Sequence, residues 1–94
     1  MNQAKYAVIF TAQQSDDLEG YPEMQQVLRQ EAEKIPGFCG MESIESNKRE
    51  ITISYWKSQD DIQAWRKNTA HTTAKSFARK WFTSFSRQIT EIVN

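Results

Sequence analysis

Residues 49–61 read Arg-Glu-Ile-Thr-Ile-Ser-Tyr-Trp-Lys-Ser-Gln-Asp-Asp, and this stretch decides the fold because a strand leads directly into a helix. Alternating side chains predict a strand with two different faces. One face carries Ile51, Ile53 and Tyr55, and the other carries Thr52, Ser54 and Trp56. The serine-x-x-acid pattern of residues 58–61 is a capping box, which predicts that a helix begins there.

The chain before this stretch predicts two strands and a helix. Residues 6–11 are a continuous apolar run, typical of a strand that is covered on both faces. Pro22 suits the first turn of a helix, and the segment Pro36-Gly37 ends that helix. Between them an apolar stripe recurs every three or four residues, formed by Tyr21, Met24, Val27, Leu28 and Ala32. Residues 38–46 are half polar and predict an edge strand, joined to the next strand by a turn.

After residue 61 the helical pattern is interrupted once and then gives way to a last strand. Asn68 and Thr69 interrupt it, a second apolar helical stripe follows through Trp81, and residues 84–93 predict the final strand. The order βαββαβ is that of an α+β, ferredoxin-like split βαβ unit. We therefore expect one domain over residues 1–94, with a four-stranded antiparallel sheet, helices on one face, and the second helix broken. The first and third strands should be central.

Composition restricts the class of function. Lysine plus arginine equals aspartate plus glutamate at 12 each, so no net charge attracts nucleic acid or an anionic membrane. Cys39 is the sole cysteine, which excludes an internal disulfide and a cysteine-based metal site. One histidine without clustered acids predicts no metal site built by this chain alone. The lone thiol and a very short apolar segment near the start predict a cytoplasmic protein.

The predicted sheet has a face that the helices cannot cover. Both helical regions of a split βαβ unit lie on one side, yet the central strands are apolar on both sides. Exposing apolar surface costs about 25 cal/mol per Å². A second copy packed sheet against sheet would cover this surface, so we expect a two-fold homodimer.

Motifs in the expected order across nearly the whole chain resemble the antibiotic biosynthesis monooxygenase (ABM) domain family. They are Tyr55-Trp56-Lys57-Ser58, Ala64-Trp65-Arg66, His71, Ala74, Arg79, Trp81 and Phe82, with Tyr21, Met24 and residues 36–43 before them. The resemblance implies a dimeric α/β barrel formed by two paired sheets. It also implies an oxidoreductase, a cofactor-independent monooxygenase acting on a small planar aromatic or phenolic molecule. Haem binding or degradation is a disfavoured alternative, because residues 6–11 lack the asparagine of that branch of the family.

Six side chains are candidates for the site. His71 is the only side chain with an unperturbed pKa near neutrality, so it is the candidate catalytic base, and Trp65 the candidate catalytic stacking partner. The candidate substrate-binding residues are Tyr55, Asn68, Arg79 and Trp81. Each also has an ordinary structural interpretation: core packing for the tryptophans, a solvated basic row for Arg79, and a helix-start hydrogen bond for His71.

Two other classes of function stay open or are set aside. A non-catalytic dimer that binds a small molecule or serves a stress response would have the same fold, and fold does not establish chemistry. RNA binding through the sheet is disfavoured, because residues 51–53 lack exposed rings and the net charge is zero.

Overall fold

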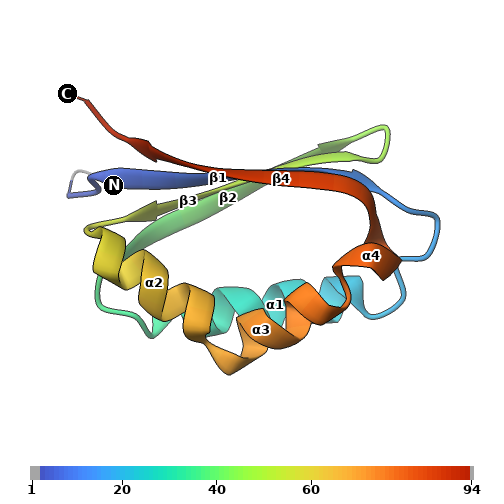
Figure 1. Ribbon diagram of the computed structural model, residues 1–94, viewed down its shortest axis with the longest axis horizontal. Coiled ribbons are helices and arrows are strands. Elements are labelled where there is room, and N and C mark those ends of the chain that lie inside the picture. The colour runs from blue at the N-terminus through green and yellow to red at the C-terminus, as the bar shows by residue number, and fades with distance from the viewer. Residues whose placement is uncertain (1–2, 94) are drawn as a thin grey trace.

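The computed structural model describes residues 3–93 and shows a four-stranded sheet with every helix on one side (Figure 1). Its elements are β1 (Tyr6–Gln14), α1 (Tyr21–Glu33), β2 (Phe38–Ser46), β3 (Arg49–Trp56), α2 (Gln59–Lys67), α3 (Thr69–Ser76), α4 (Ala78–Trp81) and β4 (Phe82–Glu91). The predicted ferredoxin-like α+β fold is confirmed.

The strand order is β2-β3-β1-β4, and all neighbouring strands are antiparallel. The first and third strands are therefore central, as the distribution of apolar residues predicted. The turn between β2 and β3 consists of Asn47 and Lys48, with φ angles of 52° and 67°. Asparagine tolerates this left-handed conformation better than most residues, which explains its place in the turn.

Four boundaries differ from the sequence prediction, one of them the end of β4 at Glu91 in place of residue 93. β1 continues to Gln14, because its polar end still pairs with both β3 and β4. β4 begins at Phe82, two residues earlier than expected, directly after the last helix. The final helical region is divided again at Phe77, whose φ of −101° and ψ of 4° leave the helical range. The apolar stripe alone did not reveal this second break.

Asn68 produces the first break in the helical region. It is the C-cap of α2 and the N-cap of α3, and its extended backbone turns the chain between them. Its Oδ1 atom accepts hydrogen bonds from the amides of Ala70 at 2.8 Å and His71 at 3.3 Å. An asparagine side chain in this position satisfies amides that have no partner within the helix.

The core is divided into two clusters. The first contains Val8, Ala32, Trp56, Ile62 and Trp65, and the second contains Ala12, Tyr21, Trp81 and Phe82. Aromatic contacts bind each cluster together, for example Phe38 against Trp56 and Tyr21 against Trp81. Separate clusters leave room for a cavity between the sheet and the helices.

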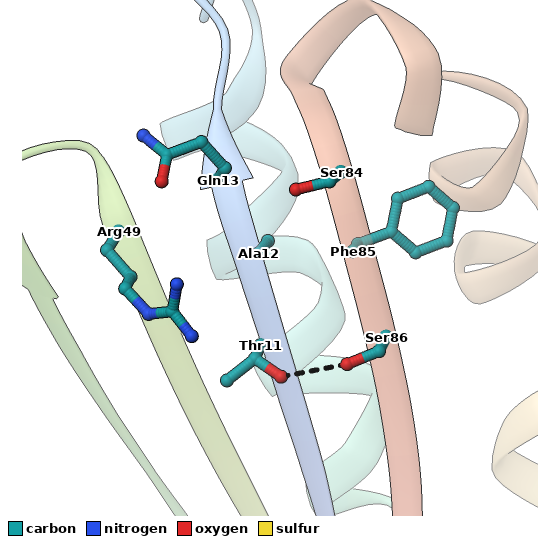
Figure 2. A pocket seen from close by; sticks show the side chains of 7 residues that line it. All are labelled: Thr11, Ala12, Gln13, Arg49, Ser84, Phe85 and Ser86. Carbon is teal, nitrogen blue, oxygen red and sulfur yellow. Dashed lines mark hydrogen bonds between the residues drawn. The ribbon is translucent and has the colours of Figure 1, made fainter.

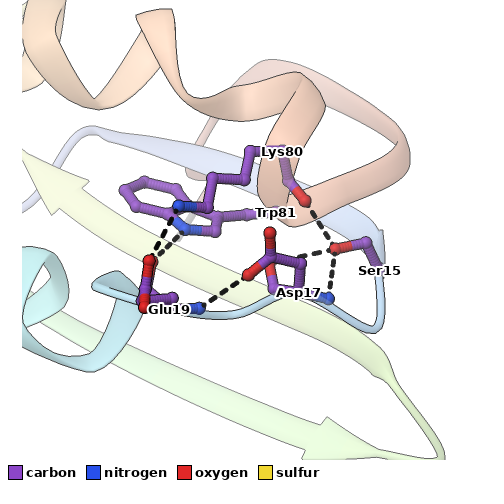
Figure 3. A network of polar contacts seen from close by, with 5 residues as sticks. All are labelled: Ser15, Asp17, Glu19, Lys80 and Trp81. Atoms are coloured by element: carbon purple, nitrogen blue, oxygen red, sulfur yellow. Dashed lines mark hydrogen bonds and ion pairs between the residues drawn. The ribbon is translucent and has the colours of Figure 1, made fainter.

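A polar network fixes the loop after β1 to α4 and so positions the second cluster (Figure 3). The hydroxyl of Ser15 donates to the carbonyl of Lys80, and the indole N–H of Trp81 donates to the carbonyl of Glu19 at 2.9 Å. The Lys80 ammonium also lies 3.4 Å from the Glu19 carboxylate. These contacts place Tyr21, the first residue of α1, with its ring centroid 5.1 Å from that of Trp81.

Within residues 3–93, no helix covers the other face of the sheet (Figure 1). Ile44 is 67% exposed and Ile51 is 37% exposed. A shallow groove of about 190 Å³ lies on this face, where the hydroxyls of Thr11 and Ser86 form a hydrogen bond between β1 and β4 at 3.0 Å (Figure 2).

Among the helices of residues 3–93, none has the length and apolar character needed to cross a membrane.

Candidate functional site

A cavity of about 810 Å³ lies between the helix-facing side of the sheet and the helices. Side chains from both core clusters line it, including Val8 and Trp65 from the first and Tyr21, Trp81 and Phe82 from the second. Its surface is mostly apolar, and nearly half of the lining residues are polar or charged, a composition that suits a small organic ligand with polar groups.

At one end of the cavity the imidazole of His71 stacks on the indole of Trp65. The ring centroids are 4.7 Å apart and the planes differ by 17°. Trp65 in turn contacts the fully buried Trp56, with ring centroids 6.2 Å apart. The break at Asn68 makes the stack possible, because it turns α3 so that His71 returns over the end of α2.

The Nδ1 atom of His71 is buried and has no hydrogen-bond partner within residues 3–93. Burial, followed by the nearby charges of Lys75 and Arg87, lowers the pKa of His71 to about 4, and a hydrogen bond with the backbone of Arg66 opposes the shift. The ordinary histidine pKa near neutrality is therefore not retained in this environment. At neutral pH the ring is uncharged, with one nitrogen as donor and the other as acceptor.

Three basic side chains come to this end from different elements. Arg66 ends α2, Lys75 lies in α3 and Arg87 lies in β4, and all line the cavity. Burial lowers the pKa of Arg87, and the charge of Arg66 lowers it further. Their combined positive potential favours an anionic or electron-rich oxygen over a cationic group.

The other end of the cavity carries a buried carboxylate that the sequence prediction missed. Glu50 is 2% exposed, and the hydroxyl of Tyr21 lies 2.7 and 2.6 Å from its two oxygens. The Nε2 of Gln14 donates to Glu50 at 3.0 Å, and the hydroxyl of Thr52 donates at 3.1 Å. Strand alternation could have identified Glu50, because this residue lies on the same helix-facing side of β3 as Thr52 and Ser54.

Tyr21 retains its proton in this environment. Burial raises its pKa well above the usual 10.0, and the hydrogen bond with Glu50 and the charge of Glu50 raise it further, against a smaller opposing hydrogen bond with Gln25. The phenol is therefore a neutral donor to the carboxylate at any moderate pH.

The structure brings together only some of the predicted site residues. Trp65, His71 and Trp81 line the cavity. The prediction that Tyr55 lines it is wrong, because alternation places that side chain on the opposite face of β3, where its hydroxyl donates to Glu42 at 2.7 Å.

Asn68 and Arg79 lie outside the lining of the cavity. The amide of Asn68 caps α3 and donates to Glu31 at 3.3 Å. The expected row of His71, Lys75 and Arg79 is interrupted because α3 ends at Ser76, and Arg79 belongs to α4. Of that row, only His71 and Lys75 border the cavity.

Comparison with known proteins gives the class. Residues 12–76 match the sequence model of the family described as antibiotic biosynthesis monooxygenase, and the chain belongs to this family. It is 39% identical over 89 residues to the uncharacterized protein YqjZ of Bacillus subtilis, an alignment that covers 93% of this chain and 78% of the relative.

Solved structures share the fold at low sequence identity. Rv0793 from Mycobacterium tuberculosis superposes with a TM-score of 0.84 at 10% identity, covering 97% of each chain. A variant of SnoaB, a cofactor-independent oxygenase from Streptomyces nogalater, superposes with a TM-score of 0.81 at 7% identity, covering 97% of this chain and 95% of that one. At these identities the likeness establishes the fold.

Proposed function

We propose that this protein is a monooxygenase that oxidises a small planar aromatic hydroxyl compound in the cavity, using oxygen and no bound cofactor. Family membership supports a monooxygenase, and the cofactor-independent chemistry of SnoaB is a precedent on the same fold. The observation that carries the proposal is the unpaired Nδ1 of His71, held against Trp65 in an apolar cavity. A buried ring nitrogen without a partner is costly, and a ligand hydroxyl, which can both donate and accept, would satisfy it.

The residues at this end of the cavity have complementary roles in the proposal. Trp65 provides a planar apolar surface, and the substrate hydroxyl donates a hydrogen bond to the ring of His71. The positive charges of Arg66, Lys75 and Arg87 favour the ionised hydroxyl, whose proton passes to water. The substrate supplies all four electrons that oxygen takes: the hydroxyl and one ring C–H lose their hydrogens, both carbons become carbonyls, and the product is a quinone. One oxygen atom enters this quinone and the other leaves with the two hydrogens as water.

The functional unit in this proposal is a homodimer through the uncovered sheet face. Ile44 and Ile51 are exposed there, and a second copy would remove them from water. The cavity lies on the opposite, helix-facing side, so each copy would keep its own site.

One observation favours a second candidate, a dimer that binds an aromatic molecule without transforming it. With a pKa of about 4, His71 is a weak base, and the surrounding positive charges oppose a proton on its ring. The site would then hold a ligand hydroxyl and do no chemistry.

Oxygen uptake with anthrone, measured on chelator-treated protein, tests the proposal and separates the two candidates. We expect uptake above the spontaneous rate, with His71→Gln reducing the catalysed part by roughly tenfold or more. The control variant Glu42→Gln lies on the opposite face of the sheet and should oxidise anthrone at the unaltered rate. Saturable anthrone binding without oxygen uptake would support the second candidate, and absence of binding would contradict both.

A further inference from the structure

We propose that Tyr21 and Glu50 form a second ligand-binding site in the cavity, which accepts a hydrogen bond from a second hydroxyl of the substrate. This inference rests on the proposed function and narrows the substrate class to planar aromatics with a hydroxyl at each end. His71 receives one hydroxyl at the end near the first core cluster. Tyr21 and Glu50 receive the other at the end near the second cluster.

The contacts of Glu50 are those of an ionised carboxylate. Tyr21, Gln14 and Thr52 all point donor groups at its two oxygens, at 2.6 to 3.1 Å. An ionised carboxylate has only acceptors, so neighbours that are all donors match it. Because Tyr21, Glu50 and Thr52 also line the cavity, this arrangement faces a ligand as well as supporting the fold.

The negative charge at this end has no cationic partner among residues 3–93. The ion pairs of the described chain are Lys34–Glu31, Lys48–Asp16 and Lys80–Glu19, and none includes Glu50. Glu45 lies opposite Glu50 in the β2–β3 register and shares the amide of Gln14, which adds a second negative charge. A buried carboxylate that only neutral groups satisfy attracts a further donor.

Tyr21 makes the preference of this end for a hydrogen-bond donor available to a ligand in the cavity. Its proton is engaged with Glu50, so its oxygen keeps lone pairs that accept a hydrogen bond from a ligand. The raised pKa of Tyr21, caused by burial and by Glu50, keeps the phenol protonated and in this orientation. The basic end around His71 therefore favours an electron-rich oxygen of the ligand, and the acidic end around Glu50 favours a hydrogen-bond donor.

Calorimetric titration under nitrogen with 2,6-dihydroxynaphthalene and with its monomethyl ether tests the inference, because the ether keeps one hydroxyl and loses the second donor. We expect the wild-type protein to prefer the dihydroxy compound by roughly tenfold or more. In Tyr21→Phe and Glu50→Gln the ratio of the two affinities should fall to about one. In Glu33→Gln, the same change on an exposed side chain at the end of α1 and outside the lining, the ratio should be retained.

The outcomes separate this inference from the proposed function. Equal affinities in the wild-type protein would overturn the second site and leave the proposed function standing, and this comparison needs no variant. A preference that persists in folded Tyr21→Phe and Glu50→Gln, checked by circular dichroism, would also overturn it. Failure of both compounds to bind the wild-type protein would overturn the inference together with the proposed function.

Discussion

Lys75 lies one turn of α3 after His71, and its positive charge lowers the pKa of the imidazole, second only to burial as a cause. The unfolded chain binds a proton at His71 below pH about 6.5, whereas the folded chain does so only below about 4. In this window the unfolded state holds more protons, so stability falls as the pH is lowered.

Urea titration at a series of pH values checks this prediction. Between pH 6.5 and about 4, His71 should remove on the order of 2 kcal/mol from the free energy of unfolding, allowing for partial solvent access. His71→Gln should lose stability less steeply over the same window, which separates this effect from carboxylates that titrate nearby. Parallel curves for the two proteins would contradict the assignment.

Gly37 is required by the close approach of Asp61. A Cβ atom at Gly37 would overlap the Asp61 carboxylate, which the hydroxyl of Ser58 holds at 2.6 Å in the first turn of α2. Gly37→Ala should therefore lower the free energy of unfolding by about 1–3 kcal/mol, measured by urea denaturation.

A double-mutant cycle identifies the cause. In an Asp61→Ala background the overlap is gone, so Gly37→Ala should be neutral or slightly stabilising, because alanine restricts the unfolded chain. A loss of the same size in both backgrounds would show that Asp61 is not responsible.

The uncovered sheet face should be a dimer interface. Ile51→Lys places a charge on that face, on the central strand β3 between β1 and β2, and should shift the protein from dimer to monomer in sedimentation velocity at micromolar concentration. The control Val27→Lys alters an exposed apolar residue of α1, on the other side of the molecule, and should leave the dimer intact. A wild-type monomer at this concentration would contradict the interface.

The sequence predicted the elements that local chemistry defines. Alternation in β3, the capping box at Ser58 and the turn at Asn47 predicted this strand, the start of α2 and the β2–β3 turn, and the order βαββαβ predicted the strand order of the sheet. The second helical break at Phe77 escaped notice, since no proline, glycine or capping residue marks it. Local patterns carry little information where tertiary packing sets the boundary.

The candidate site was only partly predictable, because it depends on which face of each strand meets the helices. Trp65, His71 and Trp81 were identified from their residue types, whereas Tyr55 was assigned to the wrong side. Glu50 was overlooked because a glutamate on a strand next to a turn usually faces water. Its burial depends on Tyr21, a residue 29 positions earlier, which sequence spacing could not associate with it.

The central claim is that a planar aromatic hydroxyl compound binds between the sheet and the helices against Trp65 and His71. The indole N–H groups of Trp56 and Trp81 are bonded to Ser54 and Glu19, so the three tryptophans provide separate reporters in proton–nitrogen correlation spectra. Under nitrogen, titration with dihydroxynaphthalene should move the Trp65 indole signal most, through stacking, and should leave the fully buried Trp56 nearly unmoved. If the compound saturates the protein and the Trp65 indole signal does not move, binding against Trp65 and His71 is contradicted.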